Sequence, residues 1–218
     1  DLFQSILDQS ISSLLVKITA EEACQFPTGL TGYVAAFQAQ HPGVVAELNI
    51  TNSYVDFSNM EADITIRPAA ALSEELAGEP ACELSLRVYA TPGYLTQNPA
   101  ASYDGHVWLG VAAPLTSTTV GEWQRRNLPD VNIVLRSNSF VGLRDAAECG
   151  LGLAMLPCCM GDPSPRLIRA EAFPEALSAS LWVATHKDMA GSAKVQSILS
   201  WFTEAIRADA DLFEGRKP

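Results

Sequence analysis

Polar and charged side chains follow three apolar, β-rich segments in the first third of the chain. Arg67 comes directly after ADITI, and its guanidinium can hold a carboxylate through two parallel hydrogen bonds. Ser53 lies in the loop after the second β-rich segment. Ligands of open parallel sheets bind beyond the carboxyl ends of the strands, so these positions predict one half of a small-molecule site. The residues after the first segment complete this half: Thr19, Ala20, Glu21, Glu22 and Ala23.

The charge of the ligand stays open. Arg67 favours a small organic acid, but an ordinary salt bridge with Glu61 or Asp63 explains an arginine at this position equally well. Glu21 and Glu22 would repel an acidic ligand unless they point outward, which leaves room for an amino acid or an amine. Solvated loop charge is the other interpretation of this acidic pair.

A second group of polar residues precedes two predicted helices further along the chain. Asn138 or Ser139 can cap the helix that contains DAAECGLG, and Ser117 and Thr118 can do the same in a Thr-Ser-Thr-Thr run. Helix N-termini attract anions, so these four residues can also contact a ligand, although capping alone explains them. Phe140 is predicted either to contact the ligand or to fill the core.

The sequence carries none of the common catalytic signatures. It contains no Gly-x-Ser-x-Gly elbow, no Walker phosphate loop, no His-Glu-x-x-His and no pair of Cys-x-x-Cys knuckles. Cys158 and Cys159, with Cys149 nearby, suggest a redox sensor, but adjacent cysteines make poor disulfide partners and structural thiols are more common. We therefore predict a binding domain that is not an enzyme and uses no metal or cofactor.

Composition narrows the class of protein further. Apolar residues make up 48% of the 218 residues and charged residues only 18%, which favours a packed globular core. The net charge of −11, without a cluster of Lys and Arg, predicts that the chain alone binds DNA poorly. No apolar stretch is long enough for a membrane span, and the odd number of five cysteines favours reduced thiols. These features predict a cytoplasmic protein with no membrane partner.

The spacing of apolar residues predicts the elements that position these side chains. Apolar residues between 2 and 14 recur every three or four positions, which indicates a helix that packs on its own domain or belongs to an intermolecular coil. Strands are predicted at 15–19, 44–50, 63–66, 84–90, 106–111, 131–136, 153–156 and 181–185. Helices are predicted near 29–40, 120–127, 141–149 and 192–208. The alternation predicts an α/β fold with parallel strands, and a second lobe after Pro92-Gly93-Tyr94.

Five segments, in their order and spacing, resemble the effector domain of LysR-type transcription regulators. They are GLTGYVAAFQAQHP with VVAELNI and ADITIRP, then ELAGEPACELSLRVYATPGYL, DAAECGLGLAMLP, PRLIR and SLWVATHKD. The third is similar to the family's Ala-x-x-Gly-x-Gly-x-x-x-Leu-Pro signature. The resemblance covers nearly the whole chain, and no single segment decides it.

The resemblance implies two Rossmann-like lobes joined by two crossing strands, as in type 2 periplasmic binding proteins. Lobe 1 would comprise residues 15–88 and 185–218, lobe 2 would comprise 89–184, and 1–14 would be a remnant of a linker helix. A small-molecule effector would bind between the lobes, and promoter DNA would be bound through a winged helix-turn-helix that this chain lacks. A free-standing solute-binding protein of the same fold is the alternative, followed by an α/β enzyme.

The resemblance also implies self-association. We expect a homodimer, with a tetramer as the alternative for the full-length regulator, and we expect the helix at 31–40 to form the contact. Tyr33, Val34 and Phe37 are predicted to face the partner, although burial in the core is the competing use of the same positions.

Overall fold

A computed structural model describes residues 14–25, 29–52, 62–128, 132–173 and 177–216. The predicted N-terminal helix and Ser53 lie outside these ranges, and Leu14, the last residue of the predicted linker, belongs to the first strand instead. The described residues form two compact units, which take parts of Asp1–Glu83 with Ser180–Ala210 (unit 1) and of Leu84–Ala179 with Asp211–Pro218 (unit 2). Two long strands, β4 (Leu76–Ala90) and β9 (Leu177–His186), pass from one unit to the other, as the sequence predicted.

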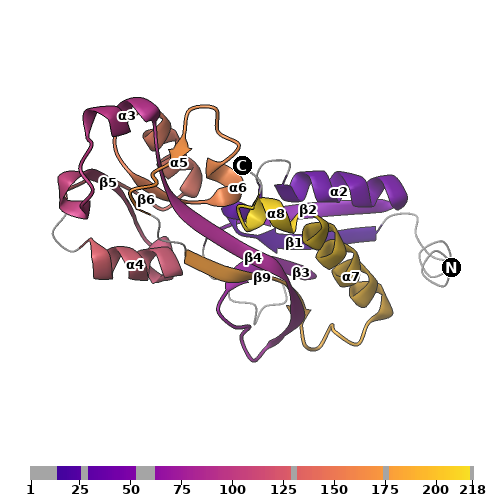
Figure 1. Cartoon of the computed structure of the whole chain (residues 1–218). Helices are drawn as coiled ribbons and strands as arrows, with labels where there is room; N and C mark the ends of the chain where they lie inside the picture. The colour runs from indigo at the N-terminus through magenta and orange to yellow at the C-terminus, as the bar shows by residue number, and fades with distance from the viewer. Residues whose placement is uncertain (1–13, 26–28, 53–61, 129–131, 174–176, 217–218) are drawn as a thin grey trace. The chain divides into compact units, whose positions relative to one another are not determined.

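Unit 1 is built on a mixed sheet (Figure 1). Strand β1 (Leu14–Ala20) pairs in parallel with β2 (Val44–Ile50) and with β3 (Ile64–Ala69). Strand β3 pairs antiparallel with β9, a pairing that the sequence did not predict. The carboxyl ends of β1, β2 and β3 therefore lie at one edge of the sheet, which brings together the loops that carry the first group of predicted site residues.

Two helices complete unit 1. Helix α2 (Gly29–Gln40) follows the short 3-10 helix Glu22–Gln25, and helix α7 (Ala193–Ala208) follows β9. The rings of Phe37 on α2 and Phe202 on α7 lie 5.7 Å apart between centroids, and both side chains are buried. Val34 is buried as well. Of the three α2 residues predicted for the dimer contact, Val34 and Phe37 are therefore used in the core of unit 1.

Unit 2 contains a parallel pair, β5 (Val107–Val111) and β6 (Asn132–Ser137), and the second half of β4. Antiparallel to β4 lie β7 (Ala154–Pro157) and β8 (Ile168–Arg169). Trp108 on β5 is fully buried, and its ring centroid lies 5.7 Å from that of Trp123 and 5.8 Å from that of Phe173. The helices of this unit are α3 (Pro92–Gln97), α4 (Thr119–Asn127), α5 (Phe140–Glu148) and α6 (Cys158–Gly161).

The glycines of the Gly-x-Gly segment have separate structural roles. Gly150 follows α5 with a φ of 77°, a left-handed conformation that favours glycine after a helix. A Cβ on Gly152 would lie 2.5 Å from the carbonyl oxygen of Val107, so only glycine allows the chain to pass this close to β5. The signature thus reflects how α5 returns to the sheet of unit 2.

The last described residues of the chain group with unit 2. The sequence prediction placed all of 185–218 in lobe 1, whereas the residues from Asp211 onward group with unit 2. Phe213, in the short helix α8 (Ala210–Phe213), is buried, and the carbonyl oxygen of Gly215 accepts a hydrogen bond from Arg169 of unit 2. These contacts are non-local, so strand and helix periodicity carries no sign of them. That the two units are the two predicted lobes stays a prediction.

Candidate functional site

The loop after β1 is fixed to both neighbouring strands. The Thr19 hydroxyl donates to the carbonyl oxygen of Asn49 on β2 at 3.1 Å. The backbone N–H of Glu21 donates to the carbonyl oxygen of Ile66 on β3 at 3.3 Å. Thr19 and Ala20 are buried, as is Ala23. The end of β1 and the loop after it are therefore packed against the sheet rather than solvated.

Glu21 and Arg67 form a buried ion pair. Arg67 Nη2 lies 3.8 Å from Glu21 Oε1, and the two residues are 3% and 4% exposed. The prediction of solvated loop charge is thus wrong for Glu21, whose side chain points into the protein. Of the two partners predicted for Arg67, Asp63 accepts through an Oδ from the backbone N–H of Lys17 at 2.8 Å. Glu61 lies outside the described residues, so a pair with Glu61 stays a prediction.

Burial changes the acidity of this pair. Removing the Glu21 carboxyl from water raises its pKa from 4.5 to about 7, and the positive charge of Arg67 opposes that rise without cancelling it. At 3.8 Å the two groups are too far apart for a direct hydrogen bond between these atoms. Unit 1 therefore places a fixed positive charge beside a carboxyl group that changes its protonation near neutral pH.

Glu22 has a different environment from Glu21. It is half-buried, its backbone N–H donates to Asn52 Oδ1 at 3.2 Å, and its Oε2 accepts from Asn52 Nδ2 at 3.3 Å. This reciprocal contact joins the loop after β1 to the loop after β2. Asn52 was not among the predicted site residues, although a polar residue directly after a β-rich segment is the signal that selected its neighbour Ser53.

The second group of predicted residues lies at the start of α5 in unit 2. Ser139 caps this helix, because its Oγ accepts from the backbone N–H of Gly142 at 3.1 Å, as predicted. Ser137 Oγ accepts from the Ser139 N–H and donates to the Ser139 carbonyl oxygen, both at 3.1 Å. Asn138 is exposed, whereas Phe140 is buried and helps to fill the core.

The turn before α4 does not cap its helix as predicted. Thr118 occupies the N-cap position, but its hydroxyl donates to the carbonyl oxygen of Leu115 at 2.7 Å instead of accepting from a helix N–H. The Ser117 hydroxyl donates to the carbonyl oxygen of Pro114 at 2.9 Å and is exposed. Both hydroxyls are engaged by the 3-10 turn Leu115–Ser117, which competes with capping.

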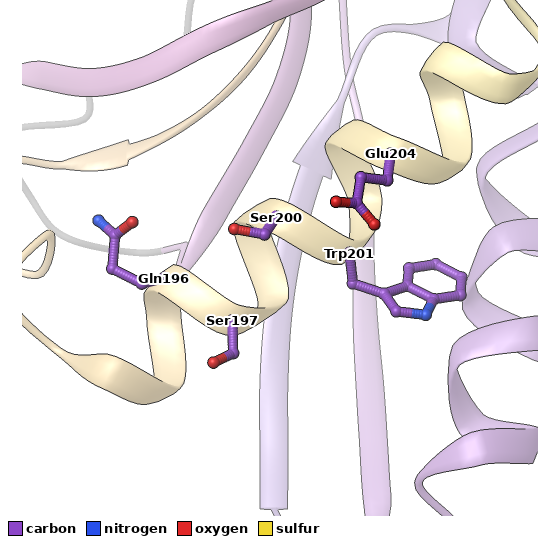
Figure 2. Close-up of a pocket in the computed structure, with 5 residues that line it drawn as sticks. All are labelled: Gln196, Ser197, Ser200, Trp201 and Glu204. Carbon is purple, nitrogen blue, oxygen red and sulfur yellow. The ribbon is translucent and has the colours of Figure 1, made fainter. Parts of the chain in front are cut away.

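A surface hollow of about 340 Å³ lies elsewhere, along α7 of unit 1 (Figure 2). Trp201 is one of its lining residues, and the Trp201 Nε1 donates to Gln40 Oε1 at the end of α2 at 3.1 Å. All the lining residues come from one helix and none is a predicted site residue: Gln196, Ser197, Ser200, Trp201 and Glu204. A single helix face of small and polar side chains offers little enclosure for a ligand.

Metal-ligating side chains and long apolar helices are two further features that bear on function. Within the described ranges, His, Cys, Asp and Glu side chains form no group of three or more that could hold a metal ion. Nor do these ranges include a helix with the length and apolar character needed to cross a membrane.

A two-unit α/β domain with strand-end polar groups and two crossing strands is typical of ligand-binding domains. The family model described as LysR substrate binding domain matches residues 15–207. The chain therefore belongs to the LysR substrate-binding domain family, whose members are effector-binding domains of transcription regulators. A comparison with curated proteins found no match.

Solved structures with the same fold include several regulatory domains. The CrgA regulatory domain from Neisseria meningitidis is 19% identical, with a TM-score of 0.72 over 88% of this chain and 98% of its own. The AmpR effector domain from Pseudomonas aeruginosa is 19% identical, with a TM-score of 0.71 over 90% and 97%. The CcmR regulatory domain from Synechocystis PCC6803, solved in complex with 2-PG, is 17% identical, with a TM-score of 0.73 over 88% and 97%. These likenesses confirm the predicted fold class, a two-lobed α/β domain like the type 2 periplasmic binding proteins.

Proposed function

We propose that this domain senses a small polar metabolite for a LysR-type regulator and that it has no catalytic activity of its own. The match of the LysR substrate-binding family over residues 15–207 carries the proposal. The complex of the related CcmR domain with 2-PG supports a small ligand for this kind of domain. Promoter DNA would be bound through a separate DNA-binding domain in the cytoplasm, since a net charge of −11 makes this chain a poor DNA ligand.

The proposed contacts come from both units. In unit 1 they are Thr19 near the end of β1, Glu21 in the loop after it, and Arg67 within β3. In unit 2 they are the polar residues that start α5, above all Ser139, whose hydroxyl lies at the helix N-terminus. Ser53, Ser117, Thr118, Asn138 and Phe140 remain weaker candidates for the same ligand.

The ion pair favours an effector that carries a carboxylate. Arg67 supplies a permanent positive charge, while Glu21 has its pKa raised to about 7 and is therefore only partly ionised at neutral pH. An anionic group near Arg67 would raise the Glu21 pKa further and thus reduce its own repulsion. An amino acid also fits, because its ammonium group can contact the carboxylate form of Glu21.

A ligand that touches both units can act as a switch. The units are joined by two crossing strands, so an effector that binds one arrangement more tightly shifts the population toward that arrangement. In a dimer, such a shift would change the spacing of the attached DNA-binding domains. The proposal thus requires differential affinity, not merely tight binding.

Calorimetry tests the proposed site. A thermal-shift screen of carboxylates, amino acids and amines first supplies the binding compound. With a carboxylate, Arg67→Ala should weaken binding by about 10- to 150-fold, because a charge-assisted hydrogen bond contributes roughly 1.5 to 3 kcal/mol. Arg126→Ala, on the exposed surface of α4, is the matched control and should leave affinity unchanged. Unchanged affinity in both Arg67→Ala and Ser139→Ala, with folded protein by circular dichroism, would place the ligand elsewhere.

A further inference from the structure

The chain passes between the two units a third time, directly after α7. Helix α7 and Asp209 belong to unit 1, whereas the residues from Asp211 onward belong to unit 2. Figure 1 shows this segment as α8, which continues from α7. We call residues 210–216 the strap.

The unit 1 end of the strap is anchored. Asp209 Oδ2 accepts a hydrogen bond from the hydroxyl of Tyr33 on α2 at 2.8 Å. Two residues before Asp209, Arg207 Nη2 donates to the carbonyl oxygen of Pro80 on β4 at 3.2 Å and lies 3.9 Å from Glu79 Oε2. The end of α7 is therefore attached to two other elements of unit 1.

The unit 2 end is held more firmly. Arg169 Nη2 donates to the carbonyl oxygen of Gly215 at 2.7 Å, and the same guanidinium binds both carboxylate oxygens of Asp162. Tyr89 also donates to Asp162 Oδ1, at 2.8 Å. Phe213 is 1% exposed, so the strap contributes an apolar anchor besides its polar one.

Gly215 fits its place closely. Its φ is 66°, in the left-handed region that residues with a Cβ rarely adopt. An added Cβ would lie 2.6 Å from Cys158 Sγ and 2.9 Å from Arg169 Nη2. The strap thus covers Cys158, whose side chain is fully buried. The exposure of this thiol is a direct measure of whether the strap is docked.

The strap is also folded within itself. Arg216 Nε donates to Asp211 Oδ1 at 2.7 Å, the Arg216 backbone N–H donates to the Asp211 carbonyl oxygen at 2.8 Å, and Arg216 also pairs with Glu214. Such a compact turn moves as one piece. Because Asp209 and Asp211 are two residues apart, their Cα atoms can separate by only about 7 Å.

We propose that the strap is a third tie between the units, which limits the arrangements that they can adopt while it stays docked. Two crossing strands alone allow the units to rotate about a hinge. A short third connection excludes every arrangement in which its two anchor points would be further apart than the connection can span. When the strap leaves its place on unit 2, the units can adopt the full range of arrangements that the two strands allow. The regulatory consequence rests on the proposed function, because the range of arrangements is what an effector would select from.

Distance measurements test the tie without any effector. Spin labels are attached through Ala39→Cys in unit 1 and Arg125→Cys in unit 2, both at exposed positions, and double electron–electron resonance reports the distance between them. Cys82 and Cys149 are replaced by Ser in this background to avoid extra labelling, and Cys158 is replaced by Ser as well, because loss of the strap would expose its thiol to the label. Dilution with unlabelled chain restricts the signal to labels within one chain. A chain ending at Asp209 should give a broader distance distribution than the complete chain.

A point variant gives an independent arm. Gly215→Ala should increase the alkylation rate of Cys158 by about 5- to 30-fold, because a Cβ disfavours the left-handed conformation and would lie too close to Cys158 in the docked strap. Peptide mass mapping measures this rate. The same substitution should also broaden the distance distribution. Gly93→Ala is the matched control in unit 2, since a Cβ there meets nothing within 4 Å.

Three outcomes overturn the proposal. One is an unchanged distance distribution in the folded chain ending at Asp209. Another is faster Cys158 alkylation in Gly215→Ala without broadening, which would show that undocking does not release the units. The third is unfolding of unit 2 when the strap is removed, which would make the strap part of the core. None of these outcomes bears on effector binding, so a failure here differs from a failure of the proposed function.

Discussion

At the scale of single residues, the unusual group is the Glu21 carboxyl, which is buried beside Arg67 and has its pKa raised to about 7. In the unfolded chain this carboxyl ionises near pH 4.5, so between pH 4.5 and 7 the folded state binds more protons than the unfolded state. The free energy of unfolding contributed by Glu21 is therefore fully present below pH 4.5 and falls as the pH rises toward 7. The fall is on the order of 3 kcal/mol.

Urea unfolding at several pH values would measure this contribution. Glu21→Gln should remove the pH-dependent part, so the variant should gain stability relative to the original chain as the pH rises from 4.5 to 7. Glu22→Gln, at the half-buried neighbouring position, is the matched control and should keep the slope. A slope that survives Glu21→Gln would show that another group titrates.

The sequence could not predict this pair, although it predicted both residues as site candidates. Glu21 and Arg67 are far apart in the chain, and the sequence predicted Glu21 in a loop and Arg67 directly after a strand, where charged residues are usually solvated. Their contact depends on the parallel pairing of β1 with β3, which brings Ala20 opposite Ile66. Periodicity thus located this strand but ended it too early, because β3 continues past Arg67 to Ala69, and the burial of both side chains depends on non-local packing.

At the scale of elements, local periodicity predicted most of the helices and strands because each one shows its buried face in a short window. Helix α2 and strand β2 have the predicted bounds, and the apolar face of α7 is buried. The first half of β4 and the antiparallel pairing of β3 with β9 were missed, since both depend on residues about a hundred positions away. Helix α3 was taken for a break, although Thr91 Oγ1 caps it and Pro92 begins it.

A contact between α4 and β5 also escaped the sequence analysis. The Gln124 side chain acts like a neighbouring strand: Oε1 accepts from the Val111 N–H at 2.9 Å, and Nε2 donates to the Leu109 carbonyl oxygen at 3.1 Å. The Gln124 amide binds the same edge of β5 that pairs with Leu153, beyond the point where that pairing ends. Helix α4 is therefore bound to the sheet by backbone-like hydrogen bonds as well as by Trp123.

Replacing this amide should destabilise unit 2. Gln124→Leu fills a similar volume but leaves one buried N–H and one buried carbonyl without their partner, at a cost of about 2 to 5 kcal/mol in the free energy of unfolding. Arg125→Ala, the exposed neighbour on α4, should change that free energy by less than about 0.5 kcal/mol. Chemical denaturation followed by Trp fluorescence reports on both, and equal stability of the two variants would contradict the role given to Gln124.

At the scale of the whole molecule, the homodimer stays a prediction, and a dimer contact through α2 would need a different face of this helix from the one first predicted. Val34 and Phe37 are buried within unit 1, and the Tyr33 hydroxyl is engaged by Asp209. The exposed positions of this helix include Ala35 and Ala36. Small side chains such as these allow close approach of a second surface, so we now predict them as the contact in place of the three residues named from the sequence.

Sedimentation at micromolar concentration distinguishes these possibilities. The unchanged chain should sediment as a dimer, and Ala35→Arg should weaken dimerisation by about tenfold or more, because a long charged side chain must lose water when it is buried in an interface. Ser200→Arg adds the same side chain at an exposed position of α7 and should leave the dimer intact. A chain that is monomeric throughout would refute the dimer itself, whereas equal dimerisation of all three proteins would move the interface away from α2. The measurement therefore separates the oligomeric state from the surface that produces it.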